Sequence, residues 1–118
     1  MLALLVALLA VVKPPTAYIA TPTGHVPLVI SSWCWDRRCG APIAAATKTA
    51  LVSRNSTAVV ELRFVPTRVR LAVDGGPVTP HLAGRELTWQ AGHGGGITLT
   101  AFGTRGWVTY VGRLRMRG

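Results

Sequence analysis

The feature that most constrains the fold of this 118-residue chain is a period-two alternation of apolar and polar side chains between Gly- and Pro-rich turns. Such alternation places successive side chains on opposite faces of a strand. The pattern predicts strands at Pro27–Ser32, Ala58–Val65, Arg68–Val73, Glu86–Gln90, Ile97–Phe102 and Trp107–Arg117. Short strands at this spacing predict an all-β fold, an antiparallel immunoglobulin-like β-sandwich of about six to seven strands.

The phase of the alternation predicts which side chains enter the core. One face carries Leu62, Phe64, Val69, Leu71, Val73, Ile97, Leu99, Ala101, Val108, Tyr110, Leu114 and Met116. The opposite, outward phase carries Glu61 and most of the arginines of these strands. Only Ala41–Val52 is compatible with a short helix, and an irregular crossover is the alternative there. We expect His93-Gly94-Gly95-Gly96 to form a hairpin turn leading into Ile97, because the nucleophile elbow that accompanies such a motif in lipases is lacking.

The amino-terminal run Met1–Val12 is apolar throughout and is followed by Lys13-Pro14-Pro15. A transmembrane helix needs about 20 apolar residues, whereas a secretory signal needs roughly 7–15. We therefore expect residues 1–20 to be a signal-peptide-like segment and linker, and residues 21–118 to be a single sandwich domain. The expected location is secreted or at the cell envelope. A buried core segment or first strand is the alternative, since no basic residue precedes the run.

Cys34 and Cys39 are the two cysteines of the chain, with four residues between them. In an exported protein this spacing predicts a disulfide that closes a small loop. A redox pair, free thiols or a metal site that recruits distant histidines (His25, His81, His93) are the alternatives. Trp33 and Trp35 flank Cys34 on one side of an extended segment. They are candidates either for packing over the disulfide in the core or for an exposed contact surface.

Two segments of the chain resemble a family of proteins. The segment Trp33-Cys34-Trp35 with Cys39, and a tail that runs from Gly96-Ile97-Thr98-Leu99 through Trp107 to Tyr110–Met116, carry the resemblance. They are similar to an aromatic-Cys-Trp…Cys segment and a β-rich tail of small secreted proteins of Gram-positive bacteria, whose function is uncharacterised. The resemblance covers roughly residues 28–117 and implies an exported β-sandwich without assigning a reaction. The chain departs from that pattern in its many arginines.

The charge balance is strongly basic, with 13 Lys and Arg against 4 Asp and Glu, a formal net charge of +9. Apolar residues make up 49% of the chain and charged ones 14%, which excludes a disordered or coiled-coil chain. Four acidic residues also leave little material for a carboxylate active site or a calcium site. Arginine binds phosphate and carboxylate groups in a fork geometry. The anion-binding candidates are the outward arginines, expected to form one ladder: Arg63, Arg68, Arg70, Arg113, Arg115 and Arg117.

These observations predict a non-catalytic exported module that binds anionic polymers or surfaces through an arginine-rich sheet face. The expected partners are an anionic cell-wall polymer, an acidic lipid surface or nucleic acid bound without sequence specificity. No cofactor, metal or small-molecule substrate is expected. A solvated face that only prevents aggregation is the simpler alternative. A second hypothesis is a protein–protein accessory domain that uses Trp33 and Trp35. An enzyme would need His81 and His93 to meet Asp36 or Asp74 in a cleft.

Overall fold

The structure is a computed structural model that describes residues 13–40, 42–43 and 49–117. Twelve strands lie within these residues: β1 (Ala17–Thr21), β2 (Gly24–Pro27), β3 (Val29–Trp35), β4 (Arg38–Gly40), β5 (Thr49–Ser53), β6 (Thr57–Leu62), β7 (Arg68–Val73), β8 (Gly76–Val78), β9 (His81–Ala83), β10 (Glu86–Gln90), β11 (Gly95–Gly103) and β12 (Gly106–Arg117). The described part of the chain contains no helix long and apolar enough to cross a membrane.

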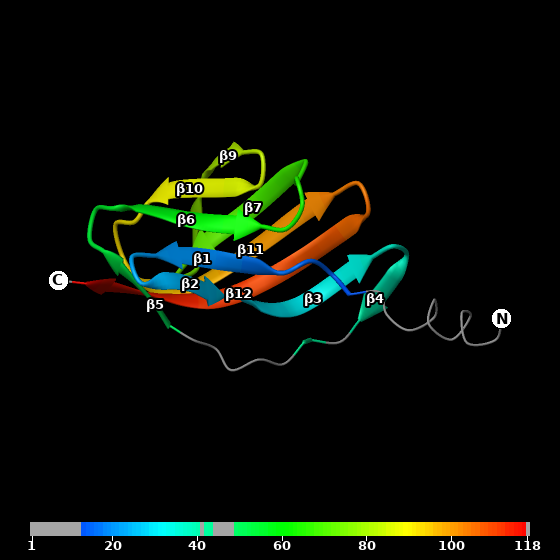
Figure 1. Cartoon of the computed structure of the whole chain (residues 1–118), viewed down its shortest axis with the longest axis horizontal. Helices are drawn as coiled ribbons and strands as arrows, with labels where there is room; N and C mark the ends of the chain where they lie inside the picture. The colour runs from blue at the N-terminus through cyan, green and yellow to red at the C-terminus, as the bar shows by residue number, and fades with distance from the viewer. Residues whose placement is uncertain (1–12, 41, 44–48, 118) are drawn as a thin grey trace.

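The strands form two packed sheets, so the predicted all-β sandwich is confirmed (Figure 1). The five-stranded sheet has the order β2-β1-β6-β10-β9, and the seven-stranded sheet has the order β4-β3-β12-β11-β7-β8 with β5 beside β12. All pairings are antiparallel except β5 with β12, which is parallel. The described residues thus form twelve strands where six or seven were expected. The additional ones are short, and hairpin turns at Asp36-Arg37 and Asp74-Gly75 join two of them to their neighbours.

The long strand β12 organises the seven-stranded sheet. One edge of β12 pairs with β11 from Gly106 to Leu114. Its other edge pairs first with β3 and then, beyond Val111, with β5. Gly106 has a φ of +150°, and a Cβ there would lie 1.9 Å from the Cys34 carbonyl oxygen, so the close approach of β3 requires glycine.

The core lies between the two sheets and has the predicted phase. Tyr110, Ile97, Leu99, Val73 and Val108 are among its largest fully buried side chains. Phe64, Val69 and Met116 are partly buried and pack against this cluster. A register slip of one residue would turn these side chains toward solvent, so burial fixes which face of each strand points outward. The arginines of β7 and β12 accordingly lie exposed on the opposite face.

Two expected boundaries differ from the structure. The sandwich begins by residue 17 rather than at the expected residue 21, because β1 pairs with β2 and β6 and its Ala17 is fully buried. The segment Ala41–Val52, for which a short helix or an irregular crossover is expected, ends in a strand, because its residues 49–52 belong to β5 and pair with β12. Residues 41 and 44–48 of that segment, and the apolar run Met1–Val12, lie outside the described residues.

Candidate anion-binding face

The charged side chains are divided unequally between the two sheets. The strands of the five-stranded sheet carry Glu61 and Glu86 and no Lys or Arg. The strands of the seven-stranded sheet carry no Asp or Glu, but six arginines: Arg38, Arg68, Arg70, Arg113, Arg115 and Arg117. The last five follow the outward phase and are exposed. The outer face of the seven-stranded sheet is therefore a cationic surface, which we call the arginine face.

Arg63 does not belong to this surface, and the expected single ladder of six arginines is wrong in this respect. Arg63 directly follows β6 in the five-stranded sheet, where its backbone N–H donates to the Thr16 carbonyl. Its guanidinium lies over the Tyr18 ring, 5.1 Å from the ring centroid. The two sheets turn their outer faces away from each other, so Arg63 and the arginines of β7 and β12 lie on opposite sides of the sandwich.

The remaining five arginines form two groups rather than one row. Arg70 is opposite Thr100, which is opposite Thr109 on β12. Arg113 lies four residues beyond Thr109 on β12. The backbones of Arg70 and Arg113 are therefore about 13 Å apart along the strands and about 10 Å apart across them. One group is therefore Arg68 and Arg70 on β7. The other is Arg113, Arg115 and Arg117 at the end of β12, which we call the β12 triplet.

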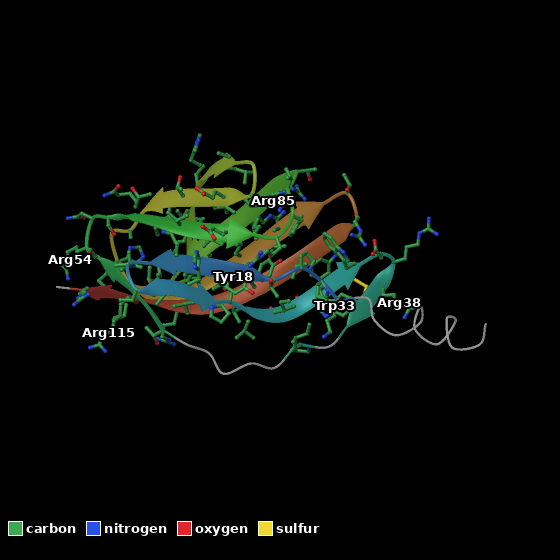
Figure 2. All side chains as sticks on the ribbon, viewed as in Figure 1. Tyr18, Trp33, Arg38, Arg54, Arg85 and Arg115 are labelled. Carbon is green, nitrogen blue, oxygen red and sulfur yellow. A yellow bond between two sulfur atoms is a disulfide. The ribbon has the colours of Figure 1, made fainter. Side chains whose placement is uncertain are left out.

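The neighbours of the β12 triplet are small or uncharged. On the β5 side the registered partners are Thr49, Leu51 and Ser53. On the β11 side Arg113 is opposite Gly96, which leaves the space beside the guanidinium open. A surface depression of about 460 Å³ lies here, lined by Thr49, Leu51, Gly95, Arg113, Leu114 and Arg115. Figure 2 shows Arg115 and Arg54 at the same end of the molecule, away from Arg38 and Trp33.

The segment His93-Gly94-Gly95-Gly96, which we call the glycine run, does not form the expected hairpin turn. Gly95 and Gly96 are the first residues of β11 and pair with Leu114 and Arg113. A Cβ at Gly94 would lie 2.8 Å from the Leu114 carbonyl oxygen, so the backbone comes close to β12 at this point. The run keeps side chains away from the β12 triplet.

The acidic side chains leave the β12 triplet unpaired. Within the described residues Arg105 forms an ion pair with Asp36, and the Glu61 carboxylate lies beside the His25 ring. Asp74 is the acidic residue closest in register, because its N–H donates to the Gly96 carbonyl one strand away from Arg113. Its side chain lies against Gly95, where an added Cβ would be 2.7 Å from the Asp74 Cβ. Arg113, Arg115 and Arg117 thus keep their hydrogen-bond donors available for an outside anion.

Aromatic side chains lie at the other end of the arginine face. Phe102 on β11 is opposite both Arg68 on β7 and Trp107 on β12, and Trp107 is opposite Cys34. The Arg68 guanidinium lies 4.2 Å from the Phe102 ring centroid, a cation–π contact. Phe102 and Trp107 are both partly exposed. A row of arginine, two aromatic rings and the disulfide therefore crosses the sheet.

Hydroxyl groups separate the aromatic row from the β12 triplet. Thr100 and Thr109 are opposite each other, with 2.8 Å between their Oγ1 atoms. Beyond them, Thr98 lies beside Ala72 and Val111. A second depression, of about 430 Å³, lies over this part of the face toward β8 and is lined by residues that include Arg70, Ala72, Pro77, Thr98 and Thr100.

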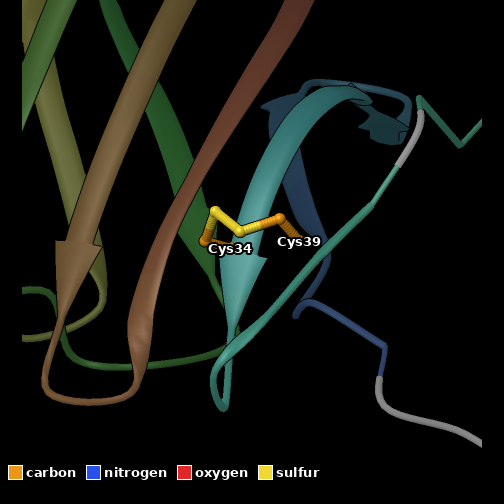
Figure 3. Close-up of a disulfide and its surroundings, with 2 residues drawn as sticks. All are labelled: Cys34 and Cys39. Carbon is orange, nitrogen blue, oxygen red and sulfur yellow. A yellow bond between two sulfur atoms is a disulfide. The ribbon is translucent and has the colours of Figure 1, made fainter.

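The disulfide between Cys34 and Cys39 is present, as predicted (Figure 3). It joins directly opposite residues of β3 and β4, with a Cα–Cα distance of 4.0 Å. The hairpin turn between these strands is held by Arg105, whose guanidinium binds the Asp36 carboxylate through two nitrogens. That hydrogen-bonded guanidinium lowers the pKa of Asp36.

The two tryptophans beside Cys34 face the core, not solvent. Trp35 is 5% exposed, and its ring centroid lies 5.0 Å from that of Phe64. Trp33 is partly buried, packs against the core cluster and lies over Gly40, where a Cβ would be 2.1 Å from its ring. Because side chains alternate along β3, both rings lie on the face opposite to Cys34. Trp35 is thus wrong as an exposed contact candidate, and the packing of the two rings is not over the disulfide.

The titratable residues considered for catalysis or metal binding are dispersed. No group of three or more His, Cys, Asp or Glu in the described residues has the geometry of a metal site. His25 lies 3.1 Å from Glu61 on the five-stranded sheet, and His81 lies opposite Thr88 on the same sheet. His93 lies two residues before β11 and Asp74 lies against Gly95 at the start of that strand, whereas Asp36 is bound to Arg105. These residues therefore do not meet His81 in one site.

Trp107 and Phe102 are the residues of this face that the sequence reasoning did not single out. The signal for Trp107 was present, because odd-numbered positions from 107 to 117 share the outward phase with the β12 triplet. Its location beside Phe102 depended on the β11–β12 register, which the alternation alone does not give. A comparison of the chain with protein-family models, curated proteins and solved structures finds no match.

Proposed function

We propose that this protein is a non-catalytic module that binds anionic polymers through the arginine face. The observation that carries the proposal is the division of charge between the two sheets. Every Asp and Glu is missing from the strands of the seven-stranded sheet, and five exposed arginines share its outer face. A face that only needed to stay soluble would be served equally well by mixed charges. A surface of one sign attracts ligands of the other sign.

The β12 triplet is the centre of the proposed binding site. Its arginines recur at every second residue of one strand, so their backbones are about 6.6 Å apart along a straight line. Each guanidinium offers paired donors that fit a phosphate or carboxylate group. A linear polymer with regularly spaced anionic groups lying along β12 would meet the three cations in succession. Arg70 extends the same surface toward β7.

The chemistry of the hairpin supports a location outside the cytoplasm. Disulfides persist in oxidising compartments and are rare in reducing ones. An exported protein of this kind would meet cell-wall polymers, acidic lipid headgroups and extracellular nucleic acid, all of which carry negative charge. The resemblance to small secreted proteins of Gram-positive bacteria supports the same proposed location, because it implies an exported β-sandwich.

The test compares two pairs of substitutions that remove the same charge from different sheets. Arg113→Ser with Arg115→Ser removes two cations from the arginine face. The control, Arg63→Ser with Arg85→Ser, removes two exposed cations from residues that flank strands of the five-stranded sheet. Binding of long-chain inorganic polyphosphate is measured by titration over a range of salt concentrations.

We expect wild-type affinity to fall steeply as salt rises, because binding releases counterions. The Arg113/Arg115 pair should weaken binding strongly and reduce the slope of log affinity against log salt by about one for each arginine that no longer binds a phosphate. The control pair should leave that slope nearly unchanged. Equal weakening in the two double variants, or a wild-type affinity that does not depend on salt, would show that the arginine face is not the binding site.

A further inference from the structure

The aromatic end of the arginine face has chemistry that charge attraction does not use. Phe102 and Trp107 are cross-strand neighbours on the two adjacent strands β11 and β12, and both are partly exposed on the same surface as the arginines. We infer that the anionic polymer bound here is single-stranded nucleic acid, with bases stacking on Trp107 and phosphates bound by the β12 triplet. The inference rests on the proposed function and names the ligand class of the same face.

Trp107 is the better placed of the two rings for stacking. The guanidinium of Arg68 lies on Phe102, so this ring already has a partner. Trp107 lies one strand farther in, next to the disulfide on its other side. Base stacking on an aromatic ring tolerates any sequence, because every base has a π face, and arginine planes beside the ring add to it. Arg68 and Phe102 thus extend the platform that Trp107 begins.

The distance between the platform and the β12 triplet suits a short stretch of nucleic acid. Trp107 and Arg113 are six residues apart on the same face of one strand, about 20 Å. Stacked nucleotides advance about 3.4 Å each along a strand, so roughly six of them, or fewer when extended, span this distance. Between the two ends lie Thr109 and Val111, which carry no charge that would repel phosphate.

The side chains missing from this sheet discriminate between polymer classes. None of its strands contains Asp, Glu, Asn or Gln. Carboxylates and amides are strong acceptors for sugar hydroxyls, and amides contact adenine edges in pairs. Their absence favours phosphate binding and base stacking over recognition of an acidic polysaccharide through its hydroxyl groups. Stacking with phosphate contacts requires neither group, and it requires bases that are free of a duplex.

The test measures binding of a labelled oligothymidylate of about ten nucleotides and of inorganic polyphosphate to the full chain. The informative variant is Trp107→Leu. Trp107→Phe keeps a ring for stacking, and Val111→Ala is the control that trims another apolar side chain of the same strand face. Circular dichroism and cooperative unfolding confirm that each variant is folded. Quenching of tryptophan fluorescence in the wild type gives a second readout that needs no substitution.

We expect Trp107→Leu to weaken oligothymidylate binding about tenfold and to leave polyphosphate binding unchanged. Trp107→Phe should restore most of the affinity, and Val111→Ala should have little effect. Oligothymidylate, but not polyphosphate, should quench the wild-type fluorescence, and a duplex of equal length should bind more weakly than the single strand.

Two outcomes would overturn the inference and remain distinguishable from failure of the proposed function. If polyphosphate binds with a steep salt dependence but oligothymidylate is insensitive to Trp107, the arginine face binds anions without stacking. If an acidic polysaccharide such as polygalacturonate binds more tightly than oligothymidylate and depends on Trp107, the ligand class is wrong. If neither polyphosphate nor oligothymidylate binds, the proposed function itself fails.

Discussion

Tyr110 shows how one side chain connects the core to the start of the chain. Its ring is fully buried, and its hydroxyl donates a hydrogen bond to the Pro15 carbonyl at 2.7 Å. Burial raises the pKa of Tyr110 above its ordinary value. Tyr18, the other tyrosine of the chain, behaves oppositely, because a hydrogen bond with Thr16 and the nearby Arg63 lower its pKa. The two tyrosines therefore differ in the pH at which they ionise.

An alkaline titration followed by tyrosinate absorbance checks this difference. We expect Tyr18 to ionise first, and Tyr110 to ionise only as the protein unfolds. A raised folded-state pKa means that the unfolded chain loses the proton first, so Tyr110 makes stability fall as pH rises above about 10. Tyr18→Phe should remove the early step alone. Tyr110→Phe should remove the late step and cost about 1 kcal/mol of unfolding free energy at neutral pH. A single step for both tyrosines in the folded protein would contradict this account.

Among the elements, the β3–β4 hairpin is held by several independent contacts. The disulfide crosses it, Arg105 binds the carboxylate of Asp36, and the Asp36 N–H donates to the Arg105 carbonyl at 2.8 Å. Strand β3 also pairs with β12 from Val29 to Trp35. The Arg105 contacts and the pairing of β3 with β12 thus hold the hairpin to the sheet in addition to the disulfide.

Replacing both cysteines by serine should therefore destabilise the protein without unfolding it. Closing a ring of this size contributes about 2 kcal/mol by loop entropy, and the destabilisation should be of that order. Chemical denaturation of the Cys34→Ser, Cys39→Ser variant measures it, and the reduced wild type provides the comparison. If the variant lost its cooperative transition altogether, the hairpin contacts other than the disulfide would be too weak to hold β4.

For the whole molecule, the first strand determines where an exported form can begin. Pro14 and Ala17 are buried, and the carbonyls of Pro15 and Thr16 accept hydrogen bonds from Tyr110 and Arg63. Removal of residues 1–20 would delete most of β1 and leave an open edge on β6, because β2 pairs with no other strand of the sheet. The sandwich therefore needs the chain from about Pro14 onward.

Intact-mass measurement of the protein released by its native host checks this boundary. If an amino-terminal segment is removed, we expect the mature chain to start at or before Pro14. The same mass reports the hydrogens lost when Cys34 and Cys39 form their disulfide. A stable, folded product that begins at residue 21 would contradict the role of β1 in the sandwich.

The alternation along each strand predicted much of what is local in this fold. Strands β7 and β10 have the predicted bounds, and Arg113, Arg115 and Arg117 are outward as expected. The alternation does not predict strand β1, because its outward positions include Ala20 as well as Tyr18 and apolar and polar side chains therefore do not alternate clearly. Short edge strands such as β4 and β8 contain three residues each, too few for any period to be visible.

The sequence by itself predicted the phase of β7, β11 and β12, the turn at Asp74-Gly75 and the Cys34–Cys39 disulfide, since each depends on neighbours along the chain. Only the tertiary structure decided which strands share a sheet. That decision separates Arg63 from Arg113, gathers the two glutamates on the other sheet, and brings Trp107 beside Phe102. Pairing between distant strands is set by how the whole set of apolar faces packs into one core, which no local pattern specifies.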